Sequence, residues 1–376
     1  MNAIRRSLGA AVLLALLGAV PGALGARSDV PTLNVEYVPD IGYAPYFVAK
    51  YEGLFKKYGV NVNLVNTPIG VTNTEIVGGQ LDLATIGPAQ PLAVADQGMP
   101  VSIVYSLVQN PGYALISNPQ IPTIAALRAI GGCRVATSTP GGLGYGWWLE
   151  YRAKLGLSNC SPTSITSLPA VIAAVGAGSV DAAVVAMGTA VIADAPPPNG
   201  AGTNLLVDPT SAGWKQTYAG VQPYPVPIPV ATVWGLKSDL AAKRGAIVSL
   251  IAALDEAMRL ITPANYTKVA TWVKLGDPAD FGTQPISQIV QELQGEGPWM
   301  GVNSVILPHV KAGQRQPDPN TLVGYVSPFT WSATLAALKG AGLPNFDPSA
   351  SVNAYSSIVD MSFWRQAYRQ YLRKTS

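Results

Sequence analysis

Short apolar runs alternate with amphipathic segments along most of the chain. Residues 33–38 have the pattern of a buried strand, and residues 44–58 then carry apolar side chains at helical spacing. Gly59 is suited to end that helix, and another strand-like run follows at 60–65. The same alternation predicts strands at 81–86, 101–107, 113–117, 133–137, 163–168, 180–185 and 230–236. Strands separated by helices are typical of βαβ units, so we expect an α/β fold with mainly parallel sheets.

One stretch of this pattern occurs twice. Residues 77–84 and 175–183 share a helix end, a glycine turn and an aspartate-bearing strand, with Asp82 in the first copy and Asp181 in the second. The second copy carries one inserted residue, and each copy is followed by a helix that ends in Ala-Asp. Chance similarity between two common βα units is the alternative, but the repeat favours two related units.

Beyond the second unit the chain is expected to return to the first. A proline-rich loop at 195–202 is followed by the strand at 230–236, and Ser238 is placed to cap a long helix that reaches about residue 262. A last helix is expected at 362–373. This order predicts a discontinuous first lobe, 31–110 with 230–376, and a second lobe, 111–229, joined by a hinge at 107–112 and 226–231.

The N-terminus has the composition of a secretory signal peptide. Arg5 and Arg6 precede an apolar stretch at 8–20, and small residues follow at 23–26. A buried N-terminal helix is the alternative. We expect residues 1–26 to be a signal peptide that directs the protein to the periplasm.

Charge and cysteine usage narrow the function further. Charged residues make up 12% of the chain, the formal net charge is +3, and no basic run exceeds short pairs, so nucleic acid is not expected as a partner. Cys133 begins one predicted strand and Cys160 lies just before the next. One helix connects these strands, and we expect the two cysteines to form a disulfide. His309 is the sole histidine of the sequence. Catalytic triads and metal clusters therefore lack members, and we expect no enzyme, no cofactor and no metal site.

Several motifs resemble those of a known family. They lie at 42–62, 78–84, 98–101 and 121–136, and in this order they resemble the nitrate/sulfonate/taurine and thiamine-pyrimidine-precursor (NMT1/THI5-like) group of periplasmic substrate-binding proteins. The resemblance covers about residues 33–258 and does not extend to 297–328. It implies a type II-like, two-lobed protein that closes on a small molecule, acts as a monomer and delivers its ligand to an ABC permease.

The candidate site follows from the strand ends. In parallel α/β sheets, ligands bind beyond the carboxyl ends of the strands, and there we expect ligand contacts from loops and helix starts. A glycine-rich loop before a helix could hold an oxyanion on its N–H groups, and aromatic faces could sandwich a planar ligand. The candidate residues are Asp40, Tyr43, Tyr46, Gly87, Ser138, Thr139, Gly141, Gly142, Trp147, Met187 and Trp234.

The ligand and its use stay open at this point. Asp40 is the single charged side chain among the expected edge loops, which argues against a phosphate ester. A small monoanion, such as a sulfonate, carboxylate or nitrate, and a neutral or cationic planar amine both remain. Import through an ABC transporter is favoured over a periplasmic sensing role, and an exported enzyme ranks third.

Overall fold

The computed structural model describes residues 30–67, 70–109, 112–138, 143–165, 168–197, 200–208, 229–296, 322–340 and 346–375. The expected signal peptide and His309 lie outside these residues. Pro31–Ser376 forms one compact unit. Among the described residues, no helix combines the length and the apolar character that crossing a membrane requires.

The first sheet is built from β1 (Thr32–Tyr37), β2 (Asn61–Asn66), β3 (Ala84–Ile86), β4 (Val101–Gln109) and β10 (Pro229–Leu236). β1 pairs in parallel with β2, and a parallel bridge between Val35 and Leu83 joins β1 to the residue before β3. β10 pairs antiparallel with β3 on one side and with β4 on the other. The strand order is therefore β2-β1-β3-β10-β4, and β10 alone of these strands runs against the others.

The second sheet has the same plan. Its strands are β5 (Tyr113–Ser117), β6 (Arg134–Thr137), β7 (Ser161–Ser164), β8 (Ala182–Ala186) and β9 (Asn204–Val207), in the order β7-β6-β8-β5-β9. β6 is parallel to β7 and β8, whereas β5 is antiparallel to β8 and β9. The expected α/β fold with mainly parallel sheets is confirmed. β9 was not predicted, because its short run follows a proline-rich loop and has no amphipathic segment beside it.

The chain passes between the two sheets twice, once between β4 and β5 and once between β9 and β10, so each antiparallel strand is the first strand after a passage. Gln109, at the end of β4, pairs with Pro229, at the start of β10, so the two crossings leave the first sheet side by side. The central residues of the expected hinge, 110–111 and 226–228, lie outside the described residues. The division into lobes at about residues 110 and 230, and the hinge itself, remain predictions.

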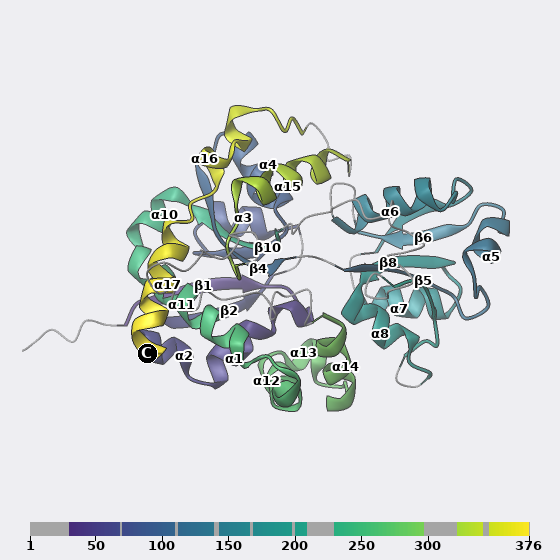
Figure 1. Cartoon of the computed structure of the whole chain (residues 1–376), viewed down its shortest axis with the longest axis horizontal. Coiled ribbons are helices and arrows are strands. Elements are labelled where there is room, and N and C mark those ends of the chain that lie inside the picture. The colour runs from purple at the N-terminus through teal and green to yellow at the C-terminus, as the bar shows by residue number, and fades with distance from the viewer. Residues whose placement is uncertain are drawn as a thin grey trace, which may run out of the picture. The chain divides into compact units, whose positions relative to one another are not determined.

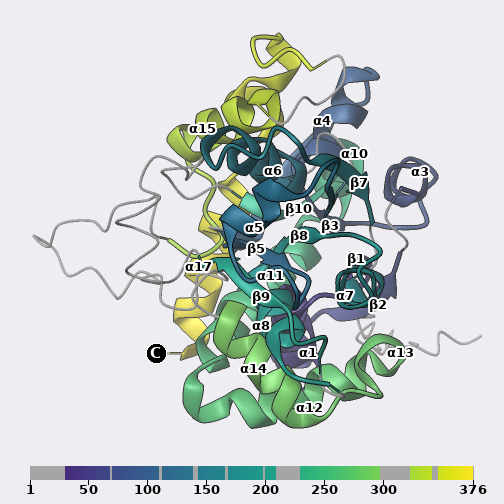
Figure 2. The same ribbon diagram turned by 90° about the vertical axis from the view of Figure 1, so that its right-hand side faces the viewer.

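Helices cover both sheets. Around the second sheet lie α5 (Ile124–Ala129), α6 (Leu143–Lys154), α7 (Leu168–Gly176) and α8 (Met187–Asp194), as Figures 1 and 2 show. We call each sheet together with its helices a unit, the first unit for the first sheet and the second unit for the second sheet. The helices of the first unit are η1 (Ile41–Tyr43), α1 (Ala44–Tyr51), α2 (Leu54–Tyr58), α3 (Thr72–Val77), α4 (Ala89–Asp96), α10 (Lys237–Ala242) and α11 (Arg244–Leu260). The C-terminal part contains η2 (Pro263–Asn265), α12 (Tyr266–Gly276), α13 (Pro278–Phe281), α14 (Ile286–Glu296), α15 (Pro328–Gly340), η4 (Ser351–Asn353), α16 (Tyr355–Ile358) and α17 (Ser362–Thr375).

Two predicted long helices are each divided in the structure. Gly53 has a left-handed backbone, with φ of 69°, and separates α1 from α2, which leaves Tyr51 of the expected apolar stripe 38% exposed. The helix expected from Ser238 to about residue 262 is interrupted at Lys243, between α10 and α11. Ser238 is not its cap: the residue before α10 is Leu236, and no side chain caps that end.

The two copies of the internal repeat make equivalent hydrogen bonds. Asp82 accepts the backbone N–H of Asn34 in β1 at 2.8 Å, and Asp181 accepts that of Arg134 in β6 at 2.7 Å. Gly79 and Gly178 occupy matching left-handed positions before these aspartates. In both copies a backbone hydrogen bond between residues three apart closes the turn: the N–H of Gly79 donates to the carbonyl of Ile76, and the N–H of Gly178 donates to the carbonyl of Val175. Val175 therefore corresponds to Ile76, and the expected one-residue insertion does not exist.

Parts of the C-terminal region join elements that precede them by more than a hundred residues. Gly324 pairs with Ser106 of β4, and its φ of 76° and the nearby ring of Tyr105 leave no room for a side chain. In α14, a Cβ atom added at Gly295 would lie 3.0 Å from Val191 of α8. The C-terminal region thus contacts both the first sheet and a helix of the second unit.

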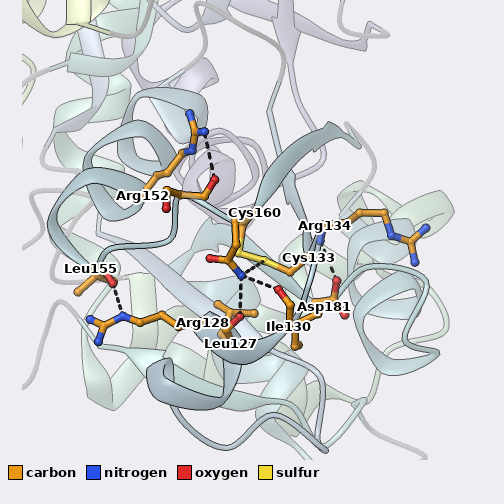
Figure 3. The surroundings of a disulfide bond; sticks show 11 residues. Leu127, Arg128, Ile130, Cys133, Arg134, Arg152, Leu155, Cys160 and Asp181 are labelled. Carbon is orange, nitrogen blue, oxygen red and sulfur yellow. Dashed lines mark hydrogen bonds between the residues drawn. A yellow bond between two sulfur atoms is a disulfide. The ribbon is translucent and has the colours of Figure 1, made fainter.

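The expected disulfide is confirmed. Cys133 and Cys160 directly precede the parallel strands β6 and β7, and their Cα atoms lie 4.4 Å apart (Figure 3). Both cysteines are buried, and the amide of Asn159 donates hydrogen bonds to the carbonyls of Leu127 and Ile130 beside them. The bond therefore closes the edge of the second sheet at which β6 and β7 begin.

Candidate functional site

A buried carboxyl group stands at the carboxyl edge of the first sheet. Glu36, the last residue but one of β1, accepts a hydrogen bond from the hydroxyl of Thr72 at 2.5 Å and from the backbone N–H of Thr85 at 3.1 Å. Loss of water raises the pKa of Glu36 from 4.5 to about 7; the two hydrogen bonds oppose this rise and the Glu75 carboxylate adds to it. Near neutral pH, Glu36 is therefore divided between its protonated and ionised forms.

Glu36 was not among the predicted site residues. The sequence does carry a signal for it, because a parallel strand covered on both faces is expected to be apolar, and a glutamate inside such a strand must have partners. A carboxyl oxygen can in general accept more than the one hydrogen bond that each of these oxygens accepts here. Glu36 is thus held in place by Thr72 and Thr85 and keeps capacity to bind a further polar group.

Two predicted aromatic residues support this carboxyl group. The hydroxyl of Tyr43 donates to the carbonyl of Thr85 at 2.8 Å, and the hydroxyl of Tyr46 lies 2.6 Å from the Thr85 hydroxyl oxygen. Both tyrosines are buried, and burial raises the pKa of each. Tyr43 and Tyr46 therefore position Thr85, whose N–H is a partner of Glu36. That they also contact ligand remains a prediction.

Asp40 is a helix cap. It accepts the backbone N–H of Gly42 at 2.7 Å and so begins η1, one turn before Pro45 in α1. Its side chain is half-buried, and the loss of water raises its pKa, while the bond from Gly42 lowers it. A ligand contact from Asp40 is compatible with the cap, since one carboxylate oxygen takes part in it.

These carboxyl groups have no basic partner in the described part of the chain. The ion pairs found there join Lys57 to Glu256, Lys243 to Asp82 and Lys268 to Glu52. None involves Glu36 or Asp40, and no cation lowers the pKa of either. Negative charge at this edge is therefore uncompensated, which disfavours an anionic ligand there.

The predicted oxyanion loop is described only at its two ends. Thr139, Gly141 and Gly142 lie outside the described residues. Ser138 is described, and its hydroxyl accepts the backbone N–H of Tyr145 in the first turn of α6 at 2.9 Å. One of the N–H groups at this helix end is therefore already bonded within the protein.

An aromatic group lies at the carboxyl edge of the second sheet. Trp147 is buried, and its ring centre is 5.6 Å from that of Tyr151 and 6.2 Å from that of Tyr113. Tyr113 is half-buried and was not predicted as a site residue. The sequence shows Tyr113 only as the start of a strand; its place at this edge depends on β5 running antiparallel to β8.

The remaining predicted residues belong to the packed interior or to turns. Met187 is buried at the start of α8, where its N–H donates to the carbonyl of Gly112. Gly87 is half-buried in the turn after β3. Trp234 is fully buried and pairs with Ala84, the first residue of β3, so it lies away from the carboxyl edge. Their ligand contacts remain predictions.

Comparisons with solved structures identify the fold. The chain is similar to the periplasmic nitrate-binding protein NrtA from Synechocystis, with a TM-score of 0.61 and 15% identity over 91% of this chain and 89% of that one. It is also similar to the alkanesulfonate-binding protein SsuA from Xanthomonas axonopodis, solved with MOPS, with a TM-score of 0.57 and 17% identity over 84% and 94% of the two chains. The chain has the periplasmic binding protein fold.

Sequence comparisons agree with the expected group. Residues 40–211 match the family model described as NMT1/THI5 like, which confirms the resemblance over that part of the chain. The riboflavin-binding protein RibY from Chloroflexus aurantiacus is 30% identical over 113 residues, which cover 28% of this chain and 32% of that protein. The same fold also occurs in the desulfurization enzyme DszB, with a TM-score of 0.55 and 14% identity over 91% and 99% of the two chains.

Proposed function

We propose that this chain is an exported solute-binding component of an ABC importer, and that its ligand is a planar ring compound that is neutral or cationic. The group formed by Glu36, Thr72 and Thr85 carries the second half of the proposal. A carboxyl group with a pKa near 7 can accept a hydrogen bond when ionised and donate one when protonated. Pyrimidine-like and flavin-like rings offer adjacent donors and acceptors along one edge, which match such a group.

The absence of a basic partner for Glu36 and Asp40 in the described residues favours such a ring over a sulfonate or nitrate. The nitrate- and sulfonate-binding proteins that share the fold do not weigh against this, since their identities to this chain are low. The short similarity to a riboflavin-binding protein is in keeping with a ring compound.

Equilibrium binding of a ligand panel tests the proposal. The panel contains riboflavin, cytosine and uracil as rings, and nitrate, taurine and MOPS as anions, each measured by calorimetry and thermal shift. At about 100 times its dissociation constant, a ligand adds about 2.7 kcal/mol to the free energy of unfolding. We expect a ring compound to bind and the anions not to bind. Tight binding of an anion, or of a phosphorylated ring in preference to the free ring, contradicts the proposed ligand class.

Three variants sharpen the test. Glu36→Ala should weaken ring binding at least tenfold, which is about 1.4 kcal/mol, because the ring edge loses its partner. Asp40→Asn should weaken binding of a cationic ring and leave a neutral ring unaffected. Asp255→Asn is the matched control: Asp255 is also a buried carboxyl group bonded to a hydroxyl, that of Tyr105, but it lies in α11 rather than at the carboxyl edge. Its affinity should equal that of the unaltered protein.

A further inference from the structure

The C-terminal helix α17 carries a row of arginines on its outer side. Arg365, Arg369 and Arg373 are spaced four residues apart, so they share one side of the helix, and all three are exposed. We call these three residues the arginine row; it extends about 12 Å along the helix axis. The other side of α17 is buried against α11 and β4 (Figure 1). Its buried residues are Phe363, Trp364, Ala367, Tyr368 and Tyr371.

Neighbouring helices bring further basic side chains to the last turns of α17. The amino group of Lys374 donates to the carbonyl of Lys57 in α2 at 2.8 Å. Arg259 of α11 lies over the ring of Tyr371, 4.9 Å from the ring centre. An acidic side chain of α11, Glu256, is already bound to Lys57. Basic groups from three helices therefore gather at this end of α17.

The charge of the chain is concentrated in α17. The helix carries four basic residues and no acidic one, whereas the whole chain carries 24 basic and 21 acidic residues. The rest of the chain, with 20 basic and 21 acidic residues, therefore has a net charge of −1, and α17 raises it to +3. No long basic run marks this region in the sequence, because the arginines come together only when the segment is helical.

Helix stability does not account for the arginine row. Like charges four residues apart repel one another and weaken a helix. Arg365 lies near the N-terminal end, where the helix dipole is positive, and only Arg373, in the last turn, is favourably placed. None of the three arginines takes part in an ion pair found within the described residues. The row is thus an exposed cationic surface without an acidic partner in the described part of the chain.

We infer that the arginine row binds the surface of a bilayer that contains anionic phospholipids. Guanidinium groups match the phosphate groups of lipid headgroups in charge and hydrogen bonding, and a membrane presents many such groups side by side. A protein partner is less well matched, because protein interfaces have an apolar core. The large apolar side chains exposed in the described residues all lie outside α2, α11 and α17.

This inference goes beyond the proposed function, because the surface is separate from the candidate ligand site. The amide of Gln370 and the amino group of Lys374 donate to the carbonyls of Tyr58 and Lys57, which come shortly before β2. This end of α17 therefore lies where the strands of the first sheet begin. Glu36 lies at the opposite, carboxyl edge, so solute and bilayer should not compete.

Sedimentation with lipid vesicles tests the inference. The vesicles contain phosphatidylcholine, with or without an equal share of phosphatidylglycerol, at about 20 mM or about 300 mM salt. We expect binding to the anionic vesicles at the lower salt concentration only. Each basic residue near an anionic membrane changes partition about fivefold, so the triple variant Arg365→Gln, Arg369→Gln, Arg373→Gln should bind about a hundredfold more weakly.

Two control variants separate the arginine row from net charge. Replacing the three arginines of the row by lysine keeps the charge, and binding should stay within about threefold. The triple variant Arg134→Gln, Lys154→Gln, Lys339→Gln removes the same charge from exposed positions outside α17 and should also keep its binding. All variants share one N-terminus, so any contribution from that segment is the same in each. Thermal unfolding confirms that each variant is folded.

Three results would overturn the inference. The first is no binding to anionic vesicles at the lower salt concentration, and the second is an equal loss in both glutamine variants. The third is binding to soluble poly-glutamate that depends on the row, without binding to vesicles, which would assign an acidic protein as the partner. All three leave the proposed function standing, because the solute panel is measured without lipid. Failure of that panel, in turn, does not change the vesicle result.

Discussion

The strand pair β1–β3 of the first sheet and the pair β6–β8 of the second are built alike at one end and differently at the other. At the end where the strands begin, Asp82 and Asp181 accept equivalent backbone N–H groups. At the carboxyl edge the hydrogen-bond register matches Glu36, Thr72 and Thr85 of the first unit with Ala136, Val171 and Val184 of the second. A buried polar group in one unit thus replaces a buried apolar group in the other.

This difference separates scaffold from function. The second unit shows that the strand pair folds with three apolar residues at these positions, so the fold does not require Glu36 or its two threonine partners. A buried carboxyl group costs free energy of solvation, and retaining it in one unit alone indicates a use other than stability. The shared aspartates, in contrast, serve the turn and strand start in both units. The following experiments test this contrast.

The largest expected effect concerns the disulfide, which the second unit has and the first unit lacks. Opening the disulfide between Cys133 and Cys160, 27 residues apart, removes a constraint on the unfolded chain. We expect a loss of about 3.5 kcal/mol in the free energy of unfolding. Urea unfolding with and without reductant measures it. The double variant Cys133→Ser, Cys160→Ser should unfold at the same urea concentration as the reduced protein, and reductant should not change that midpoint. Equal midpoints for the oxidised protein, the reduced protein and the variant would contradict the expectation.

Glu36 should make stability depend on pH. Its pKa is raised from 4.5 to about 7 in the folded protein, so between these values the folded state holds the proton more tightly than the unfolded chain. Stability therefore falls as pH rises from about 4.5 to about 7, by about 3 kcal/mol from this group. Glu36→Gln does not titrate, so its stability relative to the unaltered protein should rise across the same window. Urea unfolding at several pH values gives the comparison.

The control for that experiment is Asp255→Asn. Burial raises the pKa of Asp255 to about 8, so its effect should extend to higher pH than that of Glu36. Parallel pH profiles for Glu36→Gln and the unaltered protein would sink the assignment of a raised pKa to Glu36.

Substituting either shared aspartate, Asp82 or Asp181, should destabilise the protein for the same reason but by different amounts. Asp82→Ala leaves the Asn34 N–H without its acceptor and removes the ion pair with Lys243, so we expect a loss of about 2 kcal/mol. Asp181→Ala affects a more exposed N–H, that of Arg134, and should cost about 1 kcal/mol. Thermal unfolding measures both. The Asn variants keep an acceptor oxygen and should recover most of the loss; equal losses for Asn and Ala would show that the hydrogen bond is not the cause.

The smallest expected effect concerns the support of Glu36. Tyr43→Phe removes the hydrogen bond to the Thr85 carbonyl and should destabilise the protein by about 1 kcal/mol. Because the Tyr43 hydroxyl acts on Glu36 only through Thr85, ring binding should change less than about threefold. Chemical unfolding and calorimetry on the same preparation report the two quantities. A large loss of affinity with unchanged stability would instead assign Tyr43 a direct ligand contact.

Much of the fold could be predicted because it depends on local periodicity. The strands at 113–117 and 230–236 were predicted to within one residue, and the α/β class followed from their alternation with helices. Helix breaks were harder to predict. Gly53 lies inside an unbroken apolar stripe, and nothing local distinguishes a glycine tolerated in a helix from one that adopts a left-handed backbone. The repeat was found, but its register was wrong by one residue because valine recurs at 175 and 77.

Residue types and their spacing were enough to predict the class of fold, the disulfide pair and the edge of each sheet at which to expect binding residues. These depend on residue types, on spacing and on the fixed direction of parallel strands. Which side chains meet at those edges could be read only from the folded chain. Glu36, Thr72 and Thr85 come from three separate elements, and Tyr113 reaches the second edge because β5 is reversed. Contacts between distant segments depend on strand order and direction, which no local pattern contains.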